Sequence, residues 1–466
     1  MIGGLGGSLI CIAQNQLFAC TLESTAKAVP RQIPVPGSPQ RIIYSSFLKQ
    51  MVVGYSSTEL VNAADYTERF IRPKIGFLDP NGHCLTSNGI DLSSAQPEES
   101  ANPEQKLYQP TGPSGERIKT LLDWQFSNNG KDYHMIVVGT EHPQSKQHGR
   151  VIYITARPSS RNPKKIDCTV KYVHPYDQPI RAIASFKPSS LILAVGDEII
   201  VQSLDPSTKR WRKLPGYKLE SVPISVTVKE PLIYVLTARH SLCVFEVHED
   251  YISLHGQAGA DREGLDHMNM SGDSKITLTA NRGGAIIGLS EIGLTQEQKL
   301  LTPVFAAHVP STVVRLNRSF KPGQAGSDET AYGTTLDGTV YRFTMLRENE
   351  WRLLKFIQNI CLSDETICPF KRKRRMTFDA LDPSNSKAEF MHVDGDILER
   401  VTSRGTRYLE EMIMKAPQIQ NEADIMEDAN RKVEKFLEFS AAVVGNAEDP
   451  YATVMLWMEN LLQVNF

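Results

Sequence analysis

The spacing of hydrophobic residues changes once along the chain, near residues 330–361. Residues 330–335 and 339–345 are short segments rich in β-branched, aromatic and small residues, on either side of a Leu-Asp-Gly turn. Directly after them, residues 346–361 place apolar side chains at every third or fourth position. A period near two predicts strands and a period near 3.6 predicts a helix. We therefore expect a β region before this point and helices after it.

Strand-like segments recur through the first 345 residues. The repeated pattern is an apolar segment that ends in a small residue, a polar turn, and a segment of β-branched and aromatic residues. It occurs at residues 8–14 with 16–22, 41–46 with 50–55, 133–140 with 150–156, 180–186 with 191–196 and 198–204, 223–228 with 231–238 and 241–248, and 275–281 with 285–290. The sets are spaced by about 40–50 residues, which is typical of four-stranded propeller blades. The pattern predicts a mainly β propeller whose closure it leaves open, with a pair of β-sandwiches as the alternative.

Polar stretches and helical segments complete the pattern. Residues 80–115 and 256–273 are rich in polar residues and predict loops. After the predicted helix 346–361, an irregular segment covers residues 362–393. Three further helices are expected, from Asp394 across Gly405 to Pro417, over residues 423–444, and over residues 451–464. The chain therefore divides into a β domain, residues 1–345, and a helical domain, residues 346–466.

Composition narrows the class of protein. The 466 residues are 41% hydrophobic and 22% charged, as is usual for a globular protein, and 51 basic residues nearly balance 53 acidic ones. Nucleic acid would therefore be bound through a local patch only. Seven scattered cysteines without a CxxC pair predict reduced thiols and neither a disulfide framework nor a zinc ribbon. No signal peptide or membrane span is expected, so we predict a soluble intracellular protein.

Two basic segments are candidate nucleic-acid contacts. The first lies in the irregular segment and consists of Lys371, Arg372, Lys373, Arg374 and Arg375. It is typical of a nuclear-import signal or a phosphate-contacting patch, and equally of a solvated run of charge.

The second basic segment is the weaker candidate, because it lies between predicted strands. It consists of Lys209, Arg210, Trp211, Arg212 and Lys213. An aromatic ring among cations suits single-stranded nucleic acid. Its position favours a polar turn at the edge of a sheet.

Motifs of enzymes are weak or absent in the sequence. Asp394 and Asp396, on either side of Gly395, could contribute to a divalent-cation site, but a capped helix start explains both acids better. Ser46 and Lys49 have Ser-x-x-Lys spacing without a companion motif. The eleven histidines show no metal-ligand spacing. We therefore predict no enzyme, no metal and no cofactor, with an enzyme that uses a propeller channel as the alternative.

Several segments resemble, in order, the C-terminal region of a family of nuclear scaffold proteins. They are the strand–turn–strand–helix of residues 331–360, His392-Val-Asp-Gly-Asp-Ile-Leu-Glu399, residues 31–42 (RQIPVPGSPQRI), residues 77–79, and residues 136–140 with 149–152. The family contains the large damaged-DNA-binding subunit, the largest cleavage and polyadenylation specificity factor subunit and the propeller subunit of the spliceosomal branch-site particle. The resemblance covers nearly the whole chain.

This resemblance implies a fold and a class of function. The fold would be the family's third seven-bladed β-propeller followed by its helical domain. The function would be a non-catalytic platform in the nucleus for other subunits of a complex, and sometimes for RNA or DNA, without a membrane or small-molecule substrate. Polyadenylation, splicing and the adaptor role in a cullin ubiquitin ligase for DNA repair all remain open. The family's two upstream propellers and the N-terminal strand that helps to close its third propeller have no counterpart here, unless residues 1–22 substitute for that strand. We therefore expect a fragment of a longer chain or a partner that supplies the rest.

Overall fold

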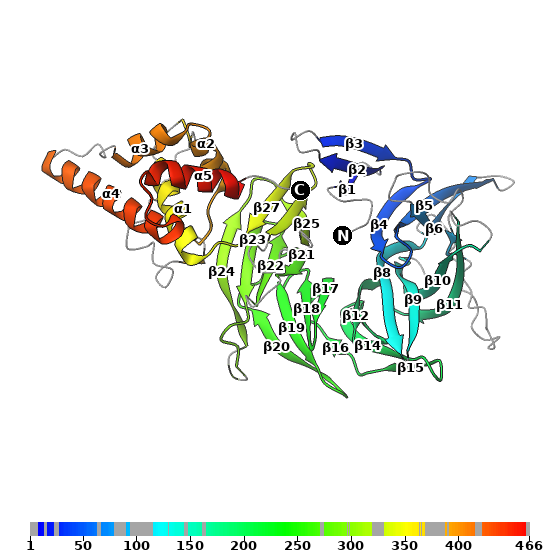
Figure 1. The fold of residues 1–466 in the computed structure, drawn as a ribbon. Helices are drawn as coiled ribbons and strands as arrows, with labels where there is room; N and C mark the ends of the chain where they lie inside the picture. Colours follow the sequence, from blue (N-terminus) through cyan, green and yellow to red (C-terminus); the bar gives the residue numbers. More distant parts are fainter. Residues whose placement is uncertain are drawn as a thin grey trace.

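The structure is a computed structural model that describes residues 8–13, 16–22, 28–62, 67–78, 90–93, 115–128, 130–143, 148–160, 165–270, 275–295, 297, 299–318, 330–362, 364, 366–368, 387–388, 391–414 and 422–462. Strands fill most of the described chain up to residue 344, and helices follow (Figure 1). The prediction of a mainly β protein with C-terminal helices is confirmed.

The strands of the first half form antiparallel groups that follow chain order. Group 1 contains β1 (Ser8–Ala13), β2 (Gln16–Leu22) and β3 (Ala28–Ile33). Group 2 contains β4 (Ser38–Ser45), β5 (Gln50–Asn62), β6 (Thr67–Leu78) and β7 (Ile90–Asp91). Group 3 contains β8 (Arg117–Asn128), β9 (Lys131–Glu141), β10 (Gly149–Pro158) and β11 (Ile166–Tyr176). Group 4 contains β12 (Ile180–Phe186), β13 (Ser190–Val195), β14 (Glu198–Asp205), β15 (Arg210–Lys213) and β16 (Tyr217–Lys218).

The next two groups share one eight-stranded sheet. Group 5 contains β17 (Pro223–Lys229), β18 (Leu232–Thr237), β19 (Leu242–Val247) and β20 (Ile252–Ala258). Group 6 contains β21 (Gly264–Asn269), β22 (Ile276–Asn281), β23 (Ala285–Ser290) and β24 (Leu300–His308). A short parallel pairing joins β20 to β24, and β17 packs against β21, so the eight strands nearly close on themselves. Group 7 contains β25 (Val313–Arg318), β26 (Thr330–Thr335) and β27 (Val340–Thr344).

Each group packs face to face against the next one along the chain. A separate hydrophobic cluster lies between groups 1 and 2, 2 and 3, 3 and 4, 4 and 5, 5 and 6, and 6 and 7. The strand β13 shows how one segment serves two clusters. Leu191 and Leu193 face group 3 while Ile192 and Ala194 face group 5. Because both faces are buried, this strand is a continuous apolar run in the sequence.

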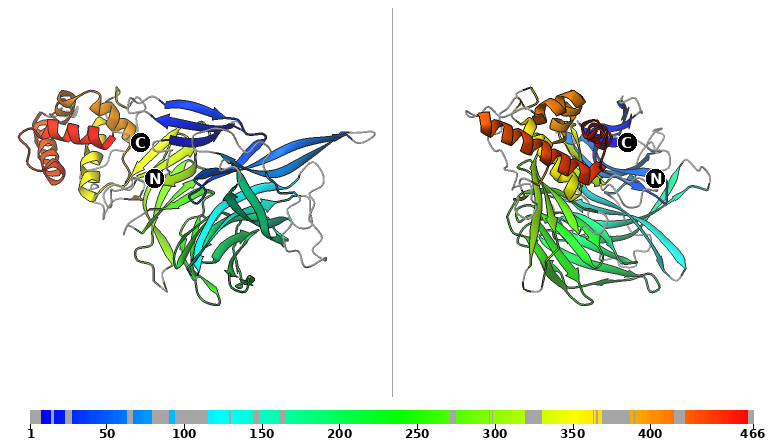
Figure 2. Two further views of the ribbon diagram at one scale, coloured as in Figure 1. Left: turned by 45° about the vertical axis from the view of Figure 1, so that its right-hand side comes forward. Right: turned by 60° about the vertical axis from the view of Figure 1, so that its left-hand side comes forward.

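The groups follow one another around an arc, with group 1 near the end of group 7 (Figure 1). Within the described part of the chain, groups 1 and 7 have no extensive contact between their strands. The β5–β6 hairpin extends well beyond the remainder of its sheet (Figure 2).

Most predicted strands are present, with ends that differ by a few residues. The sequence pattern missed β3, β6, β7, β8, β11, β15, β16, β20, β21, β24 and β25. Several of these strands contain charged residues or a proline, such as Pro73 in β6 and Pro303 in β24, which conceal a period of two. The predicted loop 256–273 is wrong, since it contains the end of β20 and all of β21. Of the predicted loop 80–115, the described residues include β7, and most of the rest lie outside the described chain.

The helices follow the predicted pattern with one correction. They are α1 (Glu348–Cys361), α2 (Gly395–Thr402), α3 (Thr406–Met414), α4 (Glu422–Val444) and α5 (Pro450–Leu462). The single helix predicted across Gly405 is wrong, because Gly405 has φ +82° and separates α2 from α3. Such a left-handed backbone ends a helix. Gly445, at φ +79°, ends α4 as predicted, and Pro417 lies outside the described residues.

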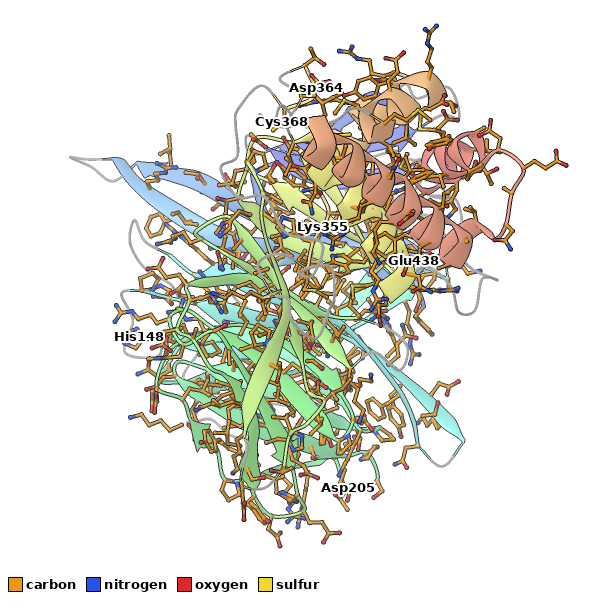
Figure 3. The ribbon with its side chains drawn as sticks, turned by 90° about the vertical axis from the view of Figure 1, so that its left-hand side faces the viewer. His148, Asp205, Lys355, Asp364, Cys368 and Glu438 are labelled. Carbon is orange, nitrogen blue, oxygen red and sulfur yellow. The ribbon has the colours of Figure 1, made fainter. Side chains whose placement is uncertain are left out.

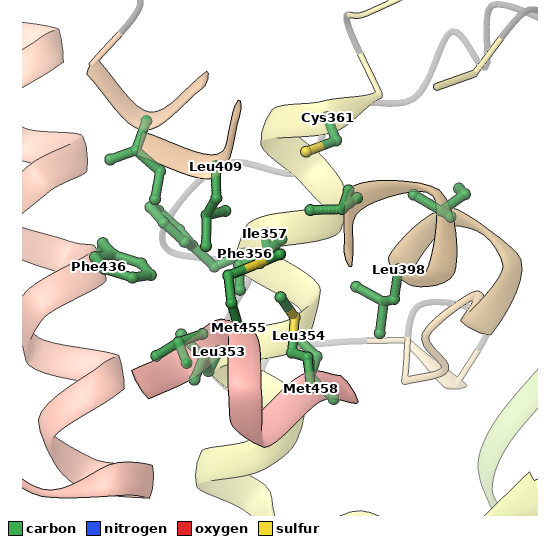
Figure 4. Packing of buried hydrophobic residues seen from close by; sticks show 14 of the residues in the cluster. Leu353, Leu354, Phe356, Ile357, Cys361, Leu398, Leu409, Phe436, Met455 and Met458 are labelled. Atoms are coloured by element: carbon green, nitrogen blue, oxygen red, sulfur yellow. The ribbon is translucent and has the colours of Figure 1, made fainter. Parts of the chain in front are cut away.

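The five helices share a hydrophobic core that contains no strand residue (Figure 4). Leu353, Leu354 and Phe356 of α1 lie against Phe436 of α4 and Met455 of α5. The strand β27 ends at Thr344 and α1 begins at Glu348, so the connection is short, as the change of period predicted. Arg342 of β27 also donates a hydrogen bond to the carbonyl of Leu461 in α5, which ties both ends of the helical unit to group 7.

Removal of one buried side chain from the helical unit should destabilise that unit without destabilising the β region. Leu354→Ala is expected to cost the helical unit roughly 2–5 kcal/mol, because Leu354 is fully packed in its core. Leu456→Ala, at a side chain that is 60% exposed, is the matched control and should change little. Hydrogen exchange should show loss of amide protection in α1–α5 only. Equal loss in β12–β14 would contradict separate cores.

A buried histidine links groups 5 and 6. His267 of β21 lies with Nδ1 2.5 Å from Ser225 Oγ and Nε2 2.8 Å from Thr227 Oγ1, both on β17. Burial lowers the pKa of His267 to about 4. The neighbouring Asp266 responds in the opposite direction, since burial raises its pKa despite the charge of Arg315.

The pKa of His267 predicts a loss of stability in mild acid. Between pH 6.5 and 4 the unfolded chain binds a proton that the folded chain excludes, so the free energy of unfolding should fall as pH falls. The loss is up to about 3 kcal/mol for this one group. Urea unfolding at several pH values should show a shallower pH dependence for His267→Gln than for wild type. His308→Gln, at an exposed position, is the control, and identical slopes for all three proteins would contradict the prediction.

Candidate functional site

The weaker basic candidate lies on an edge strand. Arg210–Lys213 form β15, so the predicted turn is wrong for these residues. The turn comes earlier, where the carboxylate of Asp205 accepts hydrogen bonds from the backbone and hydroxyl groups of Ser207 and Thr208. These bonds, those of Ser207 first, lower the pKa of Asp205 to about 2. Figure 3 shows Asp205 at the end of the β region that is remote from the helices.

Trp211 does not present a free ring for stacking. Its ring centroid is 4.7 Å from that of Tyr153, 5.1 Å from that of His174 and 6.2 Å from that of Trp124. Trp211 therefore belongs to the aromatic cluster between groups 3 and 4. Strand alternation explains why the flanking cations are exposed while Trp211 is half-buried.

The cations of β15 remain accessible. Arg210, Arg212 and Lys213 are exposed, and Arg212 Nη2 lies 3.3 Å from Asp250 Oδ1 in an exposed ion pair. The exposed Lys209 takes the left-handed position before the strand, at φ 56°. Positive charge without a stacking ring could contact phosphate but would not hold bases.

The Asp-Gly-Asp segment starts a helix, as predicted. Asp394 is the N-cap of α2, and its side chain accepts a hydrogen bond of 3.1 Å from the backbone N–H of Asp396. Two buried polar groups of α1 fix the segment, since Lys355 Nζ donates to His392 O at 2.8 Å and Gln358 Oε1 accepts from the Asp394 N–H at 2.9 Å. Gly395 is the first residue of α2. Within the described chain, no group of three His, Cys, Asp or Glu side chains is arranged to hold a metal ion.

The stronger basic candidate cannot be placed. Lys371, Arg372, Lys373, Arg374 and Arg375 all lie outside the described residues. Among the described helices, none combines the length and hydrophobicity that crossing a bilayer requires.

A polar cluster that the sequence did not reveal joins groups 2 and 3. Asp123 Oδ1 lies 2.6 Å from His134 Nε2 and accepts a hydrogen bond of 2.9 Å from Ser45 Oγ. Gln125 Nε2 donates to the other carboxylate oxygen at 2.5 Å, and the exposed ring of Phe47 stacks on His134 with centroids 4.3 Å apart. Ser45 and Asp123 are 78 positions apart, so only the packing of the two groups brings them together.

This cluster lacks the geometry of a catalytic triad. A triad needs the acid and the serine on different nitrogens of the histidine. Here Ser45 Oγ, at 3.4 Å, and Asp123 both approach Nε2 of His134. Burial alone would raise the pKa of Asp123, but the hydrogen bond and charge of His134 outweigh it and lower this pKa. The cluster is therefore suited to fixing the β4–β5 turn on group 3.

A second unforeseen contact is a buried ion pair at the start of group 3. Arg150 donates to both carboxylate oxygens of Glu116 at 2.7 Å, and both side chains are almost fully buried. Thr140 Oγ1 donates to Glu116 Oε1 at 2.5 Å, and Arg150 also donates to the carbonyl of Leu92. Satisfied bonding of this kind makes removal of either partner costly. The pair ties group 2 to group 3.

Comparison of the chain with models of known protein families and with curated proteins found no match.

Trp211 should act as a packing residue. Trp211→Ala is expected to lower the free energy of unfolding by roughly 3 kcal/mol, because it opens a cavity in the cluster between groups 3 and 4. Lys213→Ser, at an exposed position of the same strand, should change it by less than about 0.5 kcal/mol. Chemical denaturation of both variants measures this. A Trp211→Ala protein as stable as wild type would show that the ring is free after all.

Proposed function

We propose that the chain is a seven-bladed β-propeller with a helical docking domain, and that it acts as a non-catalytic scaffold in complexes of the nucleus. The observation that carries the proposal is the serial packing of seven strand groups. The first strands β4, β8, β12, β17, β21 and β25 also lie next to one another in that order. Sheets arranged radially around their first strands are the hallmark of a propeller. In this interpretation residues 1–345 form the propeller and residues 346–466 the helical domain.

The family resemblance supports the same interpretation. The segment that carries it, residues 331–360, is the β26–β27–α1 unit, and residues 392–399 surround the capped start of α2. The nuclear location and the partner class, subunits of a polyadenylation or splicing complex together with RNA or DNA, rest on this resemblance.

A scaffold function is consistent with the parts of the chain that remain available on the surface. Sheets buried on both faces leave the turns between strands, the strand edges and the helices for contacts. The alternative within the family is an adaptor module of a cullin ubiquitin ligase in DNA repair. An enzyme is the alternative of another class, and the shared Nε2 contact of Ser45 and Asp123 disfavours the most suggestive catalytic set.

Affinity purification of the full chain from nuclear extract, with mass spectrometry, should separate the branches. We expect enrichment of polyadenylation subunits or of splicing subunits, and a cullin would favour the adaptor alternative. The same chain carrying Leu354→Asp is the matched control, since a charge in the helical core should release partners held by the helices. Copurification of none of the three classes would overturn the scaffold proposal.

Deletion of residues 371–375 tests the basic candidate within the same proposal. If these residues direct import or contact phosphate, the deleted chain should lose nuclear localisation or retention on RNA or DNA. Unchanged localisation and unchanged retention would leave only a solvated run of charge.

A further inference from the structure

The first strands of six consecutive groups contain a β-bulge at the same position. In each case the register with the following strand shifts by one residue near the start of the strand. A bulge turns the extra side chain out of the regular alternation. The extra residues are Gln40, Lys119, Arg181, Ile224, Leu265 and Val314.

These equivalent positions divide into a polar and an apolar half. Groups 2, 3 and 4 supply an amide and two cations, whereas groups 5, 6 and 7 supply three aliphatic side chains. The packing of the six sheets does not require polar residues at three of these positions and aliphatic residues at the other three. Among the extra bulge residues, charge is therefore confined to groups 3 and 4.

Ion pairs and hydrogen bonds bring the polar half together in one place. Lys119 Nζ lies 2.8 Å from Glu141 Oε2, and Arg181 Nη1 lies 3.3 Å from Glu141 Oε1. Arg41, which follows Gln40, donates to the carbonyls of Lys119 at 2.5 Å and Gln40 at 2.7 Å. Side chains near the starts of β4, β8 and β12 thus meet around Glu141, which ends β9.

Positive charge exceeds negative charge in this cluster. Among the described residues Arg41 contacts only backbone carbonyls and no carboxylate. Arg315 of β25 lies 3.7 Å from Asp266, and its charge adds to burial, the larger cause, in lowering the pKa of Arg41 to about 10. Burial would raise the pKa of Glu141, but Lys119, Arg181 and Arg117 together lower it. Arg41, Lys119 and Arg181 therefore outnumber Glu141 at this place, and Arg315, paired with Asp266, is close enough to act on the charge of Arg41.

We propose that Arg41, Lys119, Arg181 and Arg315 form a binding site for a small multivalent phosphate. Guanidinium groups bind phosphate oxygens in pairs, and a partly buried site strengthens each bond. A nucleic-acid strand would need a basic track that continues, whereas the bulge positions of groups 5, 6 and 7 are the aliphatic Ile224, Leu265 and Val314. A compact anion with several negative charges fits the cluster best. Glu141 competes with that anion for Lys119 and Arg181.

The ligand can reach this site from solvent. The Arg315 side chain is 52% exposed, and those of Lys119 and Arg181 are also accessible in part. The site does not depend on the scaffold function, so each can fail without the other.

Calorimetric titration of the full chain with pyrophosphate, at constant ionic strength, tests the proposal. We expect saturable binding that Arg41→Gln and Arg315→Gln each weaken at least tenfold. Glu141→Gln should tighten binding, because it removes the competing carboxylate. Arg282→Gln, at an exposed cation paired with Glu263 at 3.2 Å, is the control and should bind like wild type.

Several outcomes would overturn this assignment. They are absence of saturable binding to wild type at millimolar pyrophosphate, equal weakening by Arg282→Gln, and weaker binding by Glu141→Gln. Saturable binding of a polyglutamate peptide without binding of pyrophosphate would overturn the phosphate class. If Arg41→Gln fails to fold by circular dichroism, the half-exposed Arg315→Gln still decides.

Discussion

Burial of both faces of a sheet is the constraint on which the β region depends. The strand β13 is apolar from Leu191 to Val195, because Leu191 and Leu193 contact one neighbouring group and Ile192 and Ala194 contact the other. The backbone then pairs within its own group, apart from the short β20–β24 pairing of groups 5 and 6, and the groups meet mainly through side chains. Apolar contact has no direction of its own, so a few polar contacts are needed to fix how one group sits on the next. Those between groups 2 and 3 centre on Asp123 and Arg150, and those between groups 5 and 6 on His267.

The helical unit follows a different rule. Its apolar residues repeat at three and four positions, so each helix buries one stripe in a shared core. Lys355 and Gln358 lie on α1 yet are buried, because each bonds the backbone next to the start of α2. These bonds hold residues 392–394 in place and so set where α2 begins. The short connection after β27 and the hydrogen bond from Arg342 to the carbonyl of Leu461 limit how far the unit can turn on group 7.

Elements that depend on local pattern were predictable from the sequence, and contacts between elements were not. Apolar runs revealed β12, β13 and β14. Asp394 and Asp449 marked helix starts through their capping carboxylates, and Gly445 marked a helix end through its left-handed backbone. Strands β6 and β8 were missed because their charged residues face solvent or neighbours, as Lys74 and Lys119 do in ion pairs. The role of Trp211 could not be inferred from its basic neighbours, since its contacts come from β8, β10 and β11. The phosphate-site candidate depends on register shifts, which no single strand reveals.

The limited contact between groups 1 and 7 has a consequence for how the molecule opens. Ile33 of group 1 lies in a hydrophobic cluster with group 2, whereas group 4 is covered by a hydrophobic cluster on each face. A series of units that touch only their neighbours loses order from its ends, where a unit has one interface to break instead of two. Local opening should therefore begin at the first strands of the chain and be rare in β13. The free energy of local opening should therefore increase along the arc from each end of the series toward its middle.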